Sequence, residues 1–294
     1  MSRTVPDDTQ LHMNQDLELP PSLTVVMVQP TTTTTTTPTM PNSDEFHCKH
    51  IPINAASLHE ITVLTALSSQ HVVRLDHIIQ SETSYTLVLV HEGKDLSRLL
   101  QSGAPFDNAP AMFCRVLSAV SYLHNAGYCH LDLKPSNIIV CQRLGTCRIA
   151  DFGHACQNSE MLSGAKGSPG FFAPEMFTEA QYDGGKADVW SLGVVFMEMI
   201  LGSDVFEQKW MSVGPFANIE HTTKDVFHIR ILRALKSLRD LERNDVYSQA
   251  IGLVFRHTVC YQPRRRWCVQ EVEKMVRDMC VDSSGIGAVE KTNE

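Results

Sequence analysis

The feature that most constrains this chain is a cluster of polar residues over 130–137, placed directly before an apolar run. Its eight residues, His-Leu-Asp-Leu-Lys-Pro-Ser-Asn, include a carboxylate, a cation and an amide, and Ile138, Ile139 and Val140 follow them. The apolar run is typical of a buried strand. Charged and amide side chains beside a buried strand need a structural or functional reason, because burying them without partners costs free energy. The pattern therefore indicates a functional loop on a rigid base.

Four further motifs follow this cluster along the chain. They are Asp151-Phe152-Gly153, residues 167–175 (Gly-Ser-Pro-Gly-Phe-Phe-Ala-Pro-Glu), residues 188–193 (Asp-Val-Trp-Ser-Leu-Gly) and residues 263–266 (Pro-Arg-Arg-Arg). Five motifs in this order resemble the eukaryotic protein kinase family over roughly residues 46 to 275. One motif alone would be a weak signal, so the specificity lies in their order.

The resemblance implies an α+β, two-lobed protein kinase-like fold. The expected domain covers 45–280, with a reduced, sheet-containing N-lobe over 45–90 and a larger helical C-lobe over 94–280. The hydrophobic pattern along the chain agrees with this two-lobed fold. It predicts strands over 46–51 and 85–90, a helix that includes residues 58–67, helices over 95–101, 109–126 and 187–201, and several more beyond Thr223.

Both ends of the chain differ in composition from this domain. Residues 1–44 are rich in Pro, Thr and Asp and include seven consecutive threonines over 31–37, so we expect a mostly disordered tail. The apolar, β-branched segment 23–29 is the exception and predicts a strand that packs on the domain. Residues 281–294 form a C-terminal tail.

Charge and cysteine content exclude several protein classes. A net charge of -8 disfavours a nucleic-acid binder, which needs an excess of Lys and Arg. No apolar run is long enough to suggest a membrane span, and the N-terminus lacks the pattern of a secretion signal. Nine cysteines without a CxxC pair suit neither a disulfide framework nor a zinc site. We expect an intracellular protein, in the cytoplasm, with the nucleus as an alternative.

The resemblance implies a chemical role for four polar residues. Asp132 would orient the substrate hydroxyl and accept its proton, and Lys134 would lie against the γ-phosphate of ATP. Asn137 and Asp151 would hold Mg²⁺ through oxygen ligands. Lys134 is similar to the serine/threonine branch of the family, in which a residue at the place of Ser168 supports the catalytic loop. The expected cofactors are thus ATP and Mg²⁺.

Other matched positions would bind adenine or support the scaffold. For adenine, Ile139 would form the floor, Leu89 the gatekeeper, and Val90 to Glu92, including His91, the hinge. An ordinary place in the core is the alternative for these residues. Among scaffold residues, Glu175 and Arg266 resemble a buried ion pair. Asp188 resembles a residue that hydrogen-bonds the backbone of the catalytic loop.

The N-lobe departs from the family pattern. Kinases cover the triphosphate with a glycine-rich loop, but this chain has no glycine before Gly93, and the threonine run stands where that loop would be. Lys49 and Glu60 resemble the lysine and helix glutamate that position the phosphates. Only eleven residues separate them, and two solvated surface charges are the alternative.

These observations support three functional hypotheses. The first is a serine/threonine kinase that acts on a protein substrate, with a catalytic loop similar to those of Mos and Wee-like kinases. The second is a pseudokinase that regulates or scaffolds partners, and the third is a small-molecule kinase. Oligomeric state stays open. Residues 203–224 predict either a packed loop or a partner surface, whereas Glu242 and Asp245 predict a solvated helix face.

Overall fold

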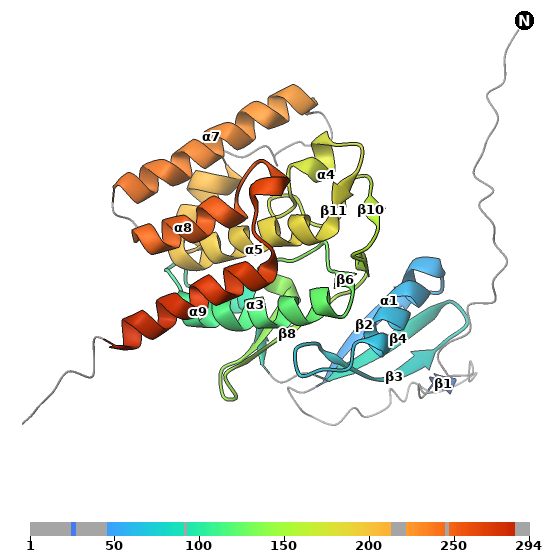
Figure 1. Ribbon diagram of the computed structural model, residues 1–294. Helices are drawn as coiled ribbons and strands as arrows, with labels where there is room; N and C mark the ends of the chain where they lie inside the picture. The colour runs from blue at the N-terminus through green and yellow to red at the C-terminus, as the bar shows by residue number, and fades with distance from the viewer. Residues whose placement is uncertain (1–24, 28–45, 91–92, 213–221, 245–246, 286–294) are drawn as a thin grey trace, which may run out of the picture.

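The computed structural model describes residues 25–27, 46–90, 93–212, 222–244 and 247–285. It consists of a small lobe built around one sheet and a larger, mostly helical lobe (Figure 1). The predicted α+β, two-lobed fold is therefore confirmed. Some features of the sequence analysis lie outside the described residues, namely the threonine run 31–37, His91, Glu92, Asp245 and the part of the segment 203–224 that covers 213–221.

The small lobe contains a four-stranded sheet in the order β1-β3-β4-β2. Its strands are β1 (Val25–Met27), β2 (Phe46–Pro52), β3 (Arg74–Gln80) and β4 (Ser84–Val90). β4 pairs antiparallel with β2 and β3, whereas β1 pairs parallel with β3. The predicted strands over 23–29, 46–51 and 85–90 thus correspond to β1, β2 and β4. β3 was not predicted, because its sequence Arg-Leu-Asp-His-Ile-Ile-Gln alternates poorly.

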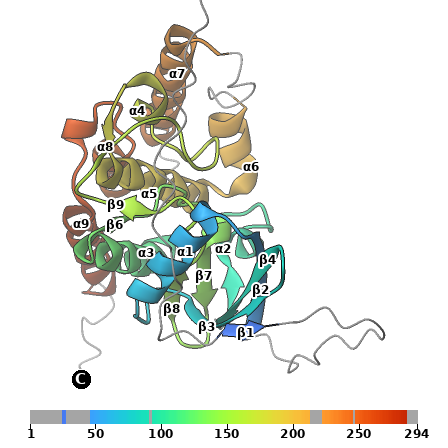
Figure 2. The same cartoon turned by 90° about the vertical axis from the view of Figure 1, so that its right-hand side faces the viewer.

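One helix, α1 (Ala55–Ala66), accompanies this sheet (Figure 2). It begins at Asn54, whose side chain accepts a hydrogen bond from the backbone N–H of Ser57 at 2.9 Å. Its buried face includes Glu60 beside Ile61 and Leu64. A carboxylate on the buried face of a helix needs a charged or hydrogen-bonding partner, and a residue of the candidate active site provides one.

The large lobe is organised around α5 (Gly184–Leu201), which is buried along most of its length. Phe196 of α5 stacks on Phe113 of α3 with ring centroids 4.2 Å apart. The remaining helices are α2 (Leu96–Leu99), α3 (Ala109–Asn125), α4 (Glu175–Thr178), α6 (Ser203–Phe206), α7 (Lys224–Arg243), α8 (Gln249–Thr258) and α9 (Val269–Gly285). One cluster of buried apolar side chains extends through both lobes.

Short strands and turns connect these helices. The strands are β5 (Lys94–Asp95), β6 (Tyr128–Cys129), β7 (Ile138–Cys141), β8 (Thr146–Ile149), β9 (Cys156–Gln157), β10 (Met161–Leu162) and β11 (Tyr182–Asp183). A 3-10 turn over Pro135–Asn137 leads directly into β7. This turn places the polar cluster between β6 and the buried strand that the sequence predicts.

Two expectations about the large lobe have clear outcomes. Phe206 and Trp210, in the segment 203–224, are buried, and the Trp210 indole donates to the carbonyl of Gly170 at 3.0 Å, so the packed alternative holds for them. The expectation that Glu242 lies on a solvated face is wrong, because its side chain is only 18% exposed. Arg256 of α8 donates to both its carboxylate oxygens, at 2.7 and 2.9 Å, because α7 and α8 pack side by side.

Within the described part of the chain, no helix combines the length and apolar character needed to cross a bilayer.

Candidate active site

Asp188 of the buried helix α5 holds the loop after β6 through hydrogen bonds. The carboxylate of Asp188 accepts the backbone N–H groups of His130 at 2.7 Å and Leu131 at 2.8 Å, and its side chain is fully buried. Leu131 adopts a left-handed backbone conformation, with φ of 66°. Such a conformation is unfavourable for leucine and persists only where the surroundings enforce it. These hydrogen bonds fix the loop that carries Asp132.

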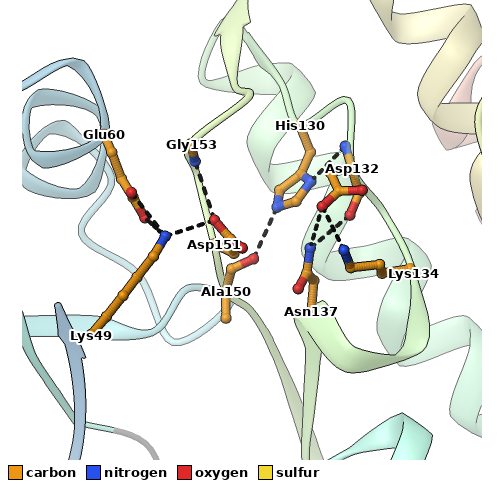
Figure 3. A network of polar contacts seen from close by, with 9 residues as sticks. All are labelled: Lys49, Glu60, His130, Asp132, Lys134, Asn137, Ala150, Asp151 and Gly153. Atoms are coloured by element: carbon orange, nitrogen blue, oxygen red, sulfur yellow. Dashed lines mark hydrogen bonds and ion pairs between the residues drawn. The ribbon is translucent and has the colours of Figure 1, made fainter. Parts of the chain in front are cut away.

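Asp132 is buried, and its two carboxylate oxygens have different surroundings (Figure 3). Oδ2 accepts hydrogen bonds from Lys134 Nζ at 2.9 Å and from Asn137 Nδ2 at 3.1 Å. Oδ1 is buried and has no hydrogen-bond partner among the described residues. A buried carboxylate oxygen without a donor is costly, so this atom would be stabilised by a further hydrogen-bond donor.

Lys134 connects this loop to the segment that follows Asp151. Its Nζ also donates to Ser168 Oγ at 2.6 Å. The adjacent Gly167 has φ of 84°, and a Cβ there would lie 2.3 Å from the carbonyl oxygen of Leu131. Glycine is therefore required for the two segments to approach this closely.

Asp151 lies on the opposite side of the same cluster (Figure 3). It also adopts a left-handed conformation, with φ of 65°, and its Oδ1 accepts Lys49 Nζ at 2.8 Å. His130 links it to the loop that carries Asp132, because His130 Nε2 donates to the carbonyl of Ala150 at 3.0 Å while Nδ1 accepts the N–H of Asp132 at 3.2 Å. The structure thus brings Asp132 and Asp151 into one network.

Lys49 of β2 joins the small lobe to this network. Its Nζ lies 2.6 and 2.9 Å from the two oxygens of Glu60 as well as 2.8 Å from Asp151. The Glu60 side chain is 5% exposed and that of Lys49 28%, so the alternative of two solvated charges is wrong. Burial alone would lower the pKa of Lys49, but its hydrogen bonds to Asp151 and Glu60 outweigh burial and raise it.

A cleft of about 310 Å³ lies beside this cluster and is lined by both lobes. The small lobe contributes Leu89 and Lys49, and the large lobe contributes Ile139, Asn137 and Asp151. Leu89 faces the cleft because it pairs across the strands with His47, two residues from Lys49. A larger cavity of about 640 Å³, lined by residues such as Leu64 and Arg148, contains none of the residues of the polar network.

Sequence reasoning missed several residues that line the cleft, among them His47 and Val73. His47 lies on the same strand face as Lys49, so the two-residue period of the strand could have identified it. Nothing in the sequence around Val73 indicated that this residue lines the cleft. Its backbone N–H donates to the carbonyl of Ile149 at 3.0 Å and so connects the lobes, which is a purely tertiary contact.

Glu175 and Arg266 form a buried pair away from the cleft. Both Nη atoms of Arg266 donate to the Glu175 carboxylate, one of them at 2.7 Å. The guanidinium also donates to the carbonyls of Cys260 at 2.7 Å and Lys186 at 3.0 Å. This pair supports the scaffold and takes no part in the polar cluster.

The family model of the protein kinase domain matches residues 32–276, most of the chain. The chain belongs to the protein kinase family. The matched region includes the residues that line the cleft and every residue of the cluster.

The chain is similar to several curated kinases. CBL-interacting serine/threonine-protein kinase 21 of Arabidopsis thaliana is 32% identical over 158 residues, which are 52% of this chain and 38% of that protein. CBL-interacting protein kinase 17 of Oryza sativa subsp. japonica is 35% identical over 158 residues, 51% of this chain and 35% of its own. Sperm motility kinase 2B of Mus musculus is 35% identical over 155 residues, 51% of this chain and 32% of its own. The match therefore spans about a third of each relative's length.

Proposed function

We propose that this kinase transfers the γ-phosphate of ATP to serine or threonine hydroxyls of protein substrates. The observation that carries the proposal is the buried Oδ1 of Asp132, which has no hydrogen-bond partner among the described residues. A substrate hydroxyl is a donor that would satisfy this oxygen. The carboxylate can then orient the hydroxyl and take up its proton as the oxygen attacks phosphorus.

The neighbours of Asp132 suit the rest of this reaction. Lys134 Nζ lies 2.9 Å from Asp132 Oδ2 and carries a positive charge to the place where negative charge develops on the transferred group. Its bond to Ser168 orients the lysine and connects the reacting centre to the segment that would seat the substrate. The name of the Arabidopsis relative, a serine/threonine-protein kinase, together with Lys134, favours serine and threonine as acceptors.

The residues present fit ATP and Mg²⁺. Asn137 and Asp151 offer the oxygen ligands that Mg²⁺ prefers, and Lys49 is oriented by Glu60 toward the same place. When bound, Mg²⁺ would neutralise phosphate charge. Leu89 and Ile139 give the cleft apolar walls for adenine. By resemblance to the family, Val90 to Glu92, including His91, would supply the hinge.

A pseudokinase is the second candidate, and one observation favours it. The chain has no glycine before Gly93, so a glycine-rich phosphate loop cannot form ahead of β2. In that case the same cleft would bind partners or nucleotide without turnover.

Asp132→Asn separates the two candidates. We expect it to reduce transfer of labelled phosphate from Mg²⁺-ATP to a mixed serine/threonine protein substrate by about 10²- to 10⁴-fold, because it removes the proton acceptor. Asp107→Asn, an exposed acid of the same lobe, is the matched control and should keep its activity. Equal rates for wild type and Asp132→Asn would leave only the pseudokinase.

A further inference from the structure

Two cysteines face each other across the short strands β6 and β9, which lie side by side in Figure 2. The strands are antiparallel, and Cys129 is directly opposite Cys156. The pairing continues one step further, where the N–H of Asn158 donates to the carbonyl of Gly127 at 2.9 Å. Opposite residues in an antiparallel pair have Cα atoms about 4.5–5.5 Å apart, which is within the range that a disulfide spans.

The two thiols are buried and interact with each other. Cys129 is fully buried and Cys156 is 8% exposed, and both are reduced. The hydrogen bond that Cys129 donates lowers the pKa of Cys156, although burial works against it, and the positive charge of Lys166 adds to the effect. The same bond raises the pKa of Cys129. By contrast, burial raises the pKa of Cys147 to about 12 and also raises that of Cys280.

We propose that Cys129 and Cys156 form an oxidative modification site at which hydrogen peroxide generates a reversible disulfide. The Cys156 thiolate attacks one peroxide oxygen and becomes a sulfenic acid, and the other oxygen leaves as hydroxide, which is protonated to water. The Cys129 sulfur then attacks the sulfenic sulfur and releases a second water. Overall, two thiols and one peroxide give one disulfide and two waters.

Because of the position of this cysteine pair, we expect the disulfide to lower the rate of phosphate transfer. This consequence rests on the proposed function. Cys129 immediately precedes His130, whose N–H is held by Asp188, and Cys156 lies in the segment that begins at Asp151. Opposite Cβ atoms are about 4.5–5.5 Å apart in a sheet but about 3.8 Å apart in a disulfide. Closing the bond therefore shifts the strand that leads to Asp132, and a shift of about 1 Å costs about 10²-fold in rate.

Disulfide mapping of the intact reduced chain tests the site without any activity measurement. The folded protein is treated with hydrogen peroxide, its remaining thiols are alkylated, and it is digested with trypsin under non-reducing conditions. We expect peptide 116–143 linked to peptide 149–166, and dithiothreitol should separate them. Peptide 116–143 also contains Cys141, so Cys141→Ser is the matched control and should retain the link, whereas Cys156→Ala should abolish it.

Failure of this inference is distinguishable from failure of the kinase assignment. Separate alkylation of Cys129 and Cys156 after peroxide treatment of the folded protein, or a link that survives in Cys156→Ala, would overturn the site. If the reduced chain transfers phosphate, peroxide should lower its rate by about 10²-fold, reversibly, and Cys156→Ala should resist this loss. A disulfide-linked protein that transfers phosphate as fast as the dithiol form would overturn the effect on catalysis.

Discussion

Asp151 shows how single residues in this cleft depend on one another. Burial would raise the pKa of its carboxyl, but the hydrogen bond and charge of Lys49 outweigh burial and hold the pKa below its ordinary value. The carboxylate is therefore ionised at neutral pH, which is the form that the proposed magnesium site requires. Lys49 in turn is held by Glu60 on α1, so one lysine connects three segments of the chain.

The lowered pKa of Asp151 predicts a pH-dependent part of the stability. A carboxyl with a lower pKa in the folded state stabilises that state above its ordinary pKa of about 3.9, and this is lost as pH falls through the folded value. The free energy of unfolding of wild type should exceed that of Asp151→Asn most at neutral pH, by up to about 1 kcal/mol, since the carboxylate is half exposed and water screens it. Urea unfolding from pH 7 to pH 3 measures this difference. A difference that grows toward acid pH would contradict the assignment, and Asp107→Asn is the control.

At the scale of elements, Arg266 joins parts of the large lobe that are distant in sequence. It pairs with Glu175 at the start of α4, donates to the carbonyl of Lys186 in α5, and lies over the Trp190 ring at 4.9 Å from the centroid. Both charged side chains are almost completely buried. Removing one partner of such a pair leaves an uncompensated buried charge.

Arg266→Met should therefore destabilise the fold strongly. We expect a loss of about 3–5 kcal/mol in the free energy of unfolding, because Glu175 would stay buried without its cation. The neighbouring Arg264→Met changes an exposed arginine of the same turn and should alter stability by less than about 0.5 kcal/mol. Urea denaturation of both variants provides the comparison. Similar values would mean that the ion pair contributes little.

For the molecule as a whole, the cleft exists only where the two lobes meet. Its lining comes from β2 and β4 of the small lobe and from β7 and the adjoining loops of the large lobe. A ligand that fits it binds only the folded chain, so binding must raise the apparent stability.

Magnesium removal tests this coupling. Mg²⁺-ATP at about 100 times its dissociation constant should stabilise the fold by about 2.7 kcal/mol, seen as a higher melting temperature. Addition of EDTA should remove most of the shift, because Asn137 and Asp151 would then lack the cation that joins them to the phosphates. A melting temperature that does not change when Mg²⁺-ATP is added at millimolar concentration would contradict nucleotide binding in this cleft.

The sequence by itself determined the family, the two-lobed fold and most of the cluster, because these signals are local. Asp132, Lys134 and Asn137 lie within six residues, and period and composition identified β2, β4, α3 and α5. It did not reveal β3, the Glu242–Arg256 pair or the cleft-facing Val73, whose partners lie on other elements.

Only the tertiary structure decided which of these groups meet. Lys49 contacts Asp151 across 102 positions, and Cys129 faces Cys156 only because β6 and β9 pair. It also decided that Leu131 adopts a left-handed conformation, which the local preference of leucine opposes. Local patterns encode the conformation of each segment, whereas contacts between distant segments arise from packing of the whole core.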